Sequence, residues 1–138
     1  MIAIKKQEIV KLEDVLHLYQ AVGWTNYTDQ SEMLEQALSH SLAIYVALDG
    51  DAVVGLIRLV GDGFSSVFVQ DLIVLPTYQR QGIGSNLMKE ALADYNDAYQ
   101  VQLATEQTEK NLGFYRSLGF ETLSTYDCAG MIWVDREK

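Results

Sequence analysis

The chain has little of several residue types, and each shortage excludes a class of protein. It contains one Pro and one Cys in 138 residues. A lone cysteine forms no disulfide within the chain, and His17 and His40 stand apart, so no metal site is predicted. No apolar run approaches the ~20 residues of a membrane span, and no long apolar region follows the N-terminal lysines. We therefore expect a cytoplasmic globular protein without a metal or a membrane partner.

Basic residues are also scarce, because 10 Lys and Arg stand against 19 Asp and Glu, for a net charge of -9. A nucleic-acid partner needs a basic face, so none is expected. The charges are unevenly placed: residues 21–51 hold five acids and no base, whereas residues 77–89 hold Arg80 and Lys89 and no acid. The first segment suits a cationic ligand and the second an anion. Equally, the acidic residues are compatible with merely solvated helix faces.

Apolar residues make up 49% of the sequence, which suits a single folded domain over residues 1–138. Helical spacing predicts helices in residues 11–22, 29–38, 83–95 and 108–119. Strands are predicted in residues 1–10, 42–60 as a hairpin around Asp49 and Gly50, 66–76, 99–105 and 120–135. The order is β-α-α-β-β-β-α-β-α-β-β. It predicts an α/β (α+β) fold, with a mixed, twisted sheet of roughly six to seven strands and about four helices.

One corner of this fold stands out, because the strand "SVFVQDLIVLP" is followed by "QRQGIGS" at the start of a helix. The first amide groups of a helix have no partner within it, and the helix dipole is positive at that end. Gly82 and Gly84 let a bulky anion approach the backbone, and Arg80 and Ser85 add a charge and a hydroxyl. The same glycines also suit a tight turn or close helix packing, so the spacing alone leaves both readings open.

The run "LIVLPTYQRQGIGSNLM" resembles the acyl-CoA-binding motif of the GNAT superfamily of N-acyltransferases, in which Gln79, Gly82 and Gly84 match the signature. "FYRSLGF", residues 114–120, resembles a later motif of that superfamily, and the predicted element order matches its fold over essentially the whole chain. The resemblance implies coenzyme A as co-substrate. It places the diphosphate on the backbone amides of Gln79, Arg80, Gln81, Gly82, Ile83, Gly84 and Ser85.

The resemblance also implies that Leu72, Ile73 and Val74 pair their backbone with the pantetheine arm. Pantetheine carries two amides, so an open sheet edge can bind it as it would an extended peptide. An ordinary central strand would have the same residues. Asn111 is the candidate for a further polar contact to the coenzyme, although relatives often have Asn where this chain has Thr108 and Ala where it has Asn111.

Two catalytic candidates follow from the resemblance. Tyr115 aligns with the tyrosine proposed to protonate the departing thiolate, but an ordinary phenol is a weaker acid than a thiol by roughly 1.5 pKa units, so hydrogen bonding to the thiolate is the safer role. A packed core aromatic is the alternative. Asp71 is the candidate base, because it is an acid within an apolar strand. Many relatives carry Glu at the position of Gln70, and Gln does not accept a catalytic proton. Asp71 is therefore equally a candidate structural acceptor of backbone N–H bonds, with deprotonation left to water or to solution.

The acceptor is expected to bind near "GWTNYTD", where Trp24 and Tyr27 either line a pocket or pack a loop onto the domain. The leading hypothesis is an N-acetyltransferase that moves an acetyl group from acetyl-CoA to a small primary amine by direct attack in a ternary complex. The alternatives are acetylation of a protein or peptide amine and a non-catalytic acyl-CoA-binding module. The sequence does not decide the oligomeric state, and a homodimer stays open.

Overall fold

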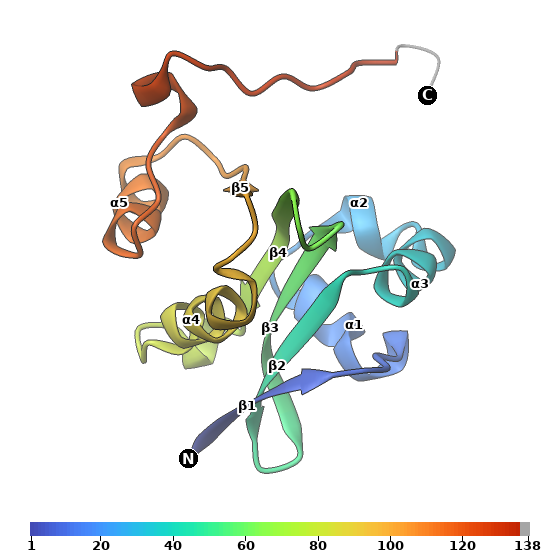
Figure 1. The fold of residues 1–138 in the computed structure, drawn as a ribbon. Helices are drawn as coiled ribbons and strands as arrows, with labels where there is room; N and C mark the ends of the chain where they lie inside the picture. The colour runs from blue at the N-terminus through green and yellow to red at the C-terminus, as the bar shows by residue number, and fades with distance from the viewer. Residues whose placement is uncertain (136–138) are drawn as a thin grey trace. The chain divides into compact units, whose positions relative to one another are not determined.

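The computed structural model describes residues 1–135, which form two compact units: Met1–Leu103 and a second unit that begins at Ala104. The first unit is built on a five-stranded sheet (Figure 1). In spatial order its strands are β1 (Ile2–Gln7), β2 (Ala43–Asp49), β3 (Ala52–Gly61), β4 (Ser66–Val74) and β5 (Gln100–Leu103). β1 to β4 pair antiparallel with their neighbours, while β5 runs parallel to β4. The predicted mixed α/β class is therefore confirmed.

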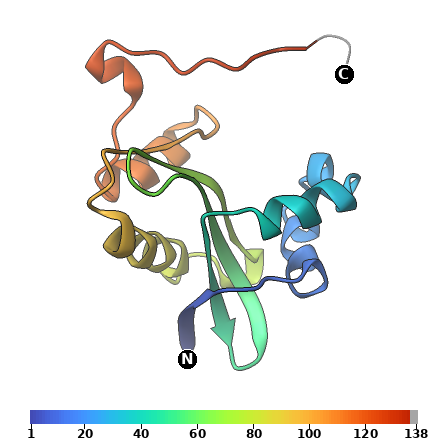
Figure 2. The same cartoon turned by 45° about the vertical axis from the view of Figure 1, so that its right-hand side comes forward.

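Helices cover both faces of this sheet (Figure 2). On one face lie α1 (Leu12–Ala21), α2 (Thr25–Thr28) and α3 (Ser31–Ser39), and on the other lies α4 (Ile83–Tyr95). Leu18 and Leu34 bury their side chains against Leu56 and Ile73 of the sheet, as the helical spacing of apolar residues predicts. Leu87 of α4 is fully buried as well. The central strands thus have apolar cover on each side, which holds the end of β4 in place.

The second unit contains α5 (Glu109–Ser117) and the short 3-10 helix η2 (Leu123–Tyr126). Thr108 caps α5, because its hydroxyl accepts a hydrogen bond of 3.1 Å from the backbone N–H of Asn111. Gly119, with φ at 97°, follows the helix in the left-handed conformation that a helix end favours. The single-domain organisation stays a prediction.

The predicted strand count is wrong for the described residues. The sheet has five strands rather than six to seven, and no residue between 120 and 135 belongs to it. Residues 123–128 close local turns instead, in which the amides of Asp127 and Cys128 bond back to Ser124 and Leu123. The apolar pattern of residues 120–135 indicates a propensity for strands. A strand also needs a neighbouring strand to pair with, and the sequence pattern does not show whether one is present. The helix number differs too, because "TNYT" forms the one-turn α2 where a loop was expected.

Within residues 1–135, no helix combines the length and the apolarity that crossing a bilayer requires. In the same part of the chain, His, Cys, Asp and Glu nowhere gather in a group of three that could hold a metal ion.

Candidate functional site

The corner between β4 and α4 has an unusual backbone. After Pro76 opens the short 3-10 helix η1 (Pro76–Tyr78), Arg80 and Gly82 both adopt the left-handed conformation, with φ at 66° and 78°. Gly82 occupies the N-cap position of α4, and no side chain caps the helix there. Alternation of left-handed and ordinary residues turns successive amide groups toward one side, which is the geometry of an anion-binding nest. The backbone of the corner is therefore compatible with the anion site that the sequence predicts, and that site stays a prediction.

Neighbouring elements hold this corner in position. The hydroxyl of Tyr78 donates a 2.6 Å hydrogen bond to Oδ2 of Asp49, at the turn between β2 and β3. The side-chain amide of Gln79 donates to the carbonyl of Val74, and the amide of Leu75 donates to the carbonyl of Val54. The side chain of Gln79 thus fixes the corner, while its backbone is the part that the sequence assigns to the ligand. The site is pre-formed, which lowers the entropic cost of binding.

The electrostatics of the helix start also favour an anion. The first turn of α4 contains no acidic residue. The positive end of the helix dipole, roughly half an elementary charge, is therefore not offset by a carboxylate within the turn. Ile83, Gly84 and Ser85 supply amide groups that have no acceptor inside the helix. These groups are available to an anionic ligand, and the diphosphate contact that the family resemblance implies for them stays a prediction.

The second half of β4 has an open edge. β5 pairs with β4 only from Ser66 to Val69, opposite Gln100–Leu103. From Asp71 to Val74, β4 pairs with β3 alone among the strands of residues 1–135. Leu72 and Val74 are half-buried there, and Ile73 is buried. A splayed edge of this kind offers backbone N–H and C=O groups to an extended amide-bearing ligand.

A β-bulge lies at the point where the edge opens. Arg58 of β3 pairs with Asp71, and its neighbour Leu59 pairs with Val69, so Gln70 is the extra residue on β4. Gln70 is exposed, whereas Asp71 is buried. Bulges bend a strand and redirect its side chains, and they are frequent beside functional sites.

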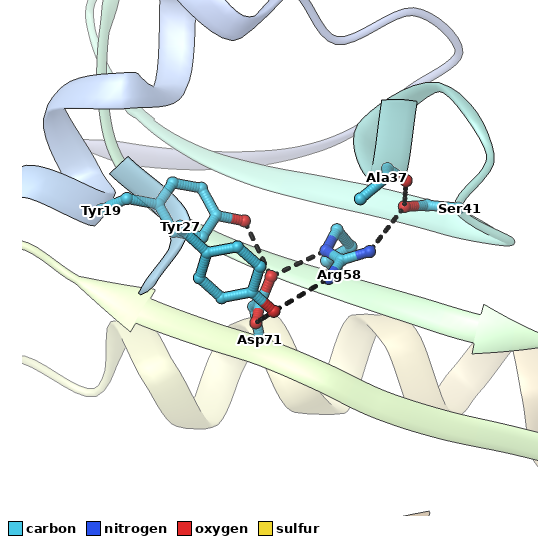
Figure 3. A network of polar contacts seen from close by, with 6 residues as sticks. All are labelled: Tyr19, Tyr27, Ala37, Ser41, Arg58 and Asp71. Carbon is cyan, nitrogen blue, oxygen red and sulfur yellow. Dashed lines mark hydrogen bonds and ion pairs between the residues drawn. The ribbon is translucent and has the colours of Figure 1, made fainter. Parts of the chain in front are cut away.

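Asp71 lies at the centre of a buried polar network (Figure 3). Its Oδ2 accepts a 2.7 Å hydrogen bond from Nε of Arg58 and a 2.8 Å bond from the hydroxyl of Tyr19. Its Oδ1 accepts a 3.0 Å bond from the hydroxyl of Tyr27. Arg58 also donates to the hydroxyls of Tyr27 and Ser41, so β3, β4, α1 and α2 are joined by one set of bonds.

This network favours the structural reading of Asp71, with side chains rather than backbone amides as the donors. Both carboxylate oxygens are occupied, and a base must first exchange one of these donors for its substrate. Burial, followed by the Asp71 carboxylate, raises the pKa of the Tyr19 hydroxyl far above its usual range. Burial alone would lower the pKa of Arg58, but Asp71 raises it overall. Both donors therefore keep their protons, and the base role stays a prediction.

Trp24 and Tyr27 pack with Tyr19 in an aromatic cluster. The ring centroids of Tyr19 and Tyr27 lie 5.2 Å apart with an edge-on orientation, and Trp24 lies 6.1 Å from Tyr19. Both residues pack against the apolar core without being fully buried. The cluster thus fits the packing alternative, while Tyr27 additionally places its hydroxyl in the Asp71 network. Their role in substrate binding stays a prediction.

The second unit holds the other two predicted site residues. The Tyr115 ring packs edge-on against Phe114 and Phe120, with centroids 5.0 and 6.1 Å away. Burial raises the pKa of its hydroxyl, so the phenol is a still weaker acid than the sequence alone suggests. The side-chain amide of Asn111 donates a 3.1 Å hydrogen bond to the hydroxyl of Thr105. Asn111 thus stabilises its own unit, and its contact to a coenzyme stays a prediction.

Sequence reasoning missed Arg58, Tyr19 and Ser41 as members of the network. A signal was present for Arg58, because it is the one charged residue of β3 and Asp71 is the one charged residue of β4. Opposite charges in two consecutive apolar strands of a predicted antiparallel pair are expected to meet. Tyr19 gave no such signal, because its helical spacing is that of an ordinary core residue.

Comparisons with known proteins point to one family. The acetyltransferase (GNAT) domain family matches residues 40–122. A solved GNAT family acetyltransferase from Streptococcus pneumoniae TIGR4 is 84% identical, with a TM-score of 0.92 over 99% of both chains. Serotonin N-acetyltransferase 2, chloroplastic, of Oryza sativa subsp. japonica is 32% identical over 66% of this chain and 48% of its own length. GCN5-related N-acetyltransferase 1, chloroplastic, of Arabidopsis thaliana is 28% identical over 95% and 66%. The chain thus spans about half and two thirds of these plant relatives.

Proposed function

Because the chain belongs to the GNAT acetyltransferase family, we propose that it transfers an acetyl group from acetyl-CoA to a primary amine of a small molecule. The observation that carries the proposal is the pre-formed corner, where the uncapped start of α4 follows the open second half of β4. The diphosphate binds the backbone amides of residues 79–85. The pantetheine arm pairs with the backbone of Leu72, Ile73 and Val74.

The reaction moves one acetyl group and one proton. The amine nitrogen attacks the thioester carbonyl carbon, the C–N bond forms, and the C–S bond breaks as the coenzyme thiolate departs. The amine loses one proton and the departing thiolate gains one, so the reaction releases no net proton. Tyr115 donates a hydrogen bond to the departing thiolate, a role that rests on the resemblance of residues 114–120 to the family motif.

We assign Asp71 to positioning rather than to proton abstraction. Its two oxygens orient the hydroxyls of Tyr19 and Tyr27, and its charge is balanced by Arg58. Tyr27 of α2 is thereby held against Asp71, which follows the bulge on the same strand as the pantetheine edge. Water in the site removes the proton of the amine, or the amine loses it in solution and enters the site as the free base.

Two observations support a small amine as acceptor. The rice relative carries the name of an enzyme that acetylates serotonin, which is a small aromatic amine. The segment from Ala21 to Asp51 has acids and no bases, and it includes the aromatic residues Trp24 and Tyr27. Acidic and aromatic groups both attract an ammonium group.

A screen of acceptors tests this proposal. The purified protein is incubated with acetyl-CoA and a panel of arylalkylamines, polyamines, amino acids and peptides, and thiol release is corrected for hydrolysis without acceptor. We expect turnover with small amines and little with peptides. Turnover confined to peptides would replace the acceptor class, and coenzyme binding without any turnover would leave a binding module.

The variant Tyr115→Phe is expected to lower kcat by about tenfold to a hundredfold, with little change in the affinity for acetyl-CoA. The range corresponds to a lost hydrogen bond to a charged group, about 1.5–3 kcal/mol. Because the pKa of Tyr115 is raised, its hydroxyl stays protonated throughout neutral and mildly basic pH, and its titration should not limit the rate there. Tyr126→Phe, at an exposed tyrosine of the same unit, is the matched control. Unchanged kcat in Tyr115→Phe would remove this residue from the mechanism.

A further inference from the structure

Arg80 has a strained backbone conformation beside the start of α4. Its φ of 66° lies in the left-handed region, which residues with a side chain rarely adopt. Such strain persists only where the surrounding structure enforces it, and it is found most often at ligand sites and switches. The contacts that hold Arg80 in this conformation are therefore candidates for control of the neighbouring site.

The strained residue belongs to a short connection that is fixed at both ends. On its C-terminal side, Ile83 is buried at the start of α4, and the carbonyl of Gly82 accepts a 3.0 Å hydrogen bond from the amide of Asn86. On its N-terminal side, the side chain of Tyr78 is bonded to another part of the sheet. Residues 79–82 alone connect these two anchors, so the backbone between them has little freedom.

The anchor at Tyr78 comes from the β2–β3 hairpin, which is distant in the sequence. The Tyr78 hydroxyl donates a 2.6 Å hydrogen bond to Oδ2 of Asp49. Among the described residues, this is the one side-chain hydrogen bond that joins residues 75–85 to a segment elsewhere in the chain. The bond to Asp49 raises the pKa of the Tyr78 hydroxyl, so the donor keeps its proton at neutral and mildly basic pH.

We propose that Asp49 and Tyr78 are positioning residues for the coenzyme, because their bond holds Arg80 in the left-handed conformation and keeps the amides of residues 79–85 turned toward the diphosphate. The inference rests on the proposed function, since it takes coenzyme A as the ligand of this corner. Both residues act through Arg80 rather than on the reacting atoms. The β2–β3 hairpin thereby controls the affinity for the coenzyme.

Loss of the bond lowers the fraction of molecules in which the corner is ready to bind. Arg80 is then free to leave the left-handed region, and the amides of residues 79–85 lose their common direction. The Kd rises by the inverse of the fraction that stays competent. A competent fraction of about one tenth corresponds to about tenfold weaker binding.

Isothermal titration with coenzyme A tests the bond in matched variants. We expect Tyr78→Phe to raise the Kd about tenfold and Asp49→Ala to raise it equally, whereas Asp49→Asn keeps an acceptor oxygen and should lose less. Tyr45→Phe is the control, because it removes a similar bond between β2 and Asp94 in the last turn of α4. We expect this control to bind coenzyme A as the native protein does. Circular dichroism checks that every variant is folded.

Two further comparisons separate positioning from a general loosening of the fold. Pantetheine carries no diphosphate, so Tyr78→Phe should leave its affinity, measured by NMR titration, unchanged. Glycine adopts a positive φ readily, so within an Arg80→Gly background the same change should weaken coenzyme binding by less than about twofold.

Three results would overturn the proposal: a Kd for coenzyme A that Tyr78→Phe leaves unchanged, an equal loss for coenzyme A and pantetheine, or an equal loss with and without Arg80→Gly. Each of these results requires a native protein that binds coenzyme A, so the proposed function would stand. A native protein that binds no coenzyme A would instead overturn the proposed function and this inference together.

Discussion

Arg58→Met should lower the free energy of unfolding by about 3–5 kcal/mol, because it removes one partner of a buried ion pair. Arg58 and Asp71 are almost fully buried, with 2.7 Å between Nε and Oδ2. Without Arg58, the Asp71 carboxylate keeps only the hydroxyls of Tyr19 and Tyr27 as donors. A buried charge without a counter-charge is far more costly than a missing surface contact. Urea denaturation followed by circular dichroism measures the change.

The chain contains a matched control for this variant. Arg116 pairs with Glu121 at 2.9 Å, but the two side chains are 51% and 37% exposed. Exposed ion pairs contribute about 0–1 kcal/mol, so Arg116→Met should change stability little. The double variant Arg58→Met with Asp71→Asn should recover part of the loss, because Asn removes the charge, its amide oxygen accepts from one tyrosine hydroxyl and its NH2 group donates to the other. Equal stabilities for Arg58→Met and Arg116→Met would contradict the role assigned to the network.

The corner and its flanking elements were predictable from the sequence because their signals are local. An apolar strand, one proline, two glycines and a periodic helix suffice to place β4 and α4, and the family that their motif suggested is confirmed. The left-handed backbone of Gly82 fits the same reading, because glycine adopts this conformation readily. The left-handed Arg80 was not foreseeable, since only the surrounding structure enforces it.

The features that sequence reasoning missed depend on partners that are distant in the chain. The meeting of Arg58 and Asp71 requires the register of β3 and β4, which the bulge at Gln70 shifts by one residue. The hydroxyls of Tyr19 and Tyr27 that occupy the Asp71 carboxylate come from α1 and α2, so the sequence did not show them, and the base role of Asp71 stays a prediction. The last strands failed for the same reason, because their propensity is visible in the sequence and their partner is not.

Gly84→Trp should weaken the binding of coenzyme A by at least about a hundredfold. Gly84 lies in the first turn of α4, where the diphosphate is proposed to approach the backbone. An indole there displaces the diphosphate from two or more amides, and each hydrogen bond to a charged group contributes about 1.5–3 kcal/mol. A loss of about 3 kcal/mol corresponds to roughly a hundredfold in Kd. Isothermal titration with coenzyme A measures this change without requiring turnover.

Asn86→Trp separates blockage of the site from the general effect of a bulky residue. Asn86 is exposed and lies two positions further along α4, so its side chain points away from the face of Gly84. Trp is a better helix former than Gly and at least as good as Asn, so both variants should stay folded. We expect Asn86→Trp to bind coenzyme A as the native protein does. If Gly84→Trp also bound it normally, the diphosphate would have to lie elsewhere, because the amides of this turn are not accessible past an indole.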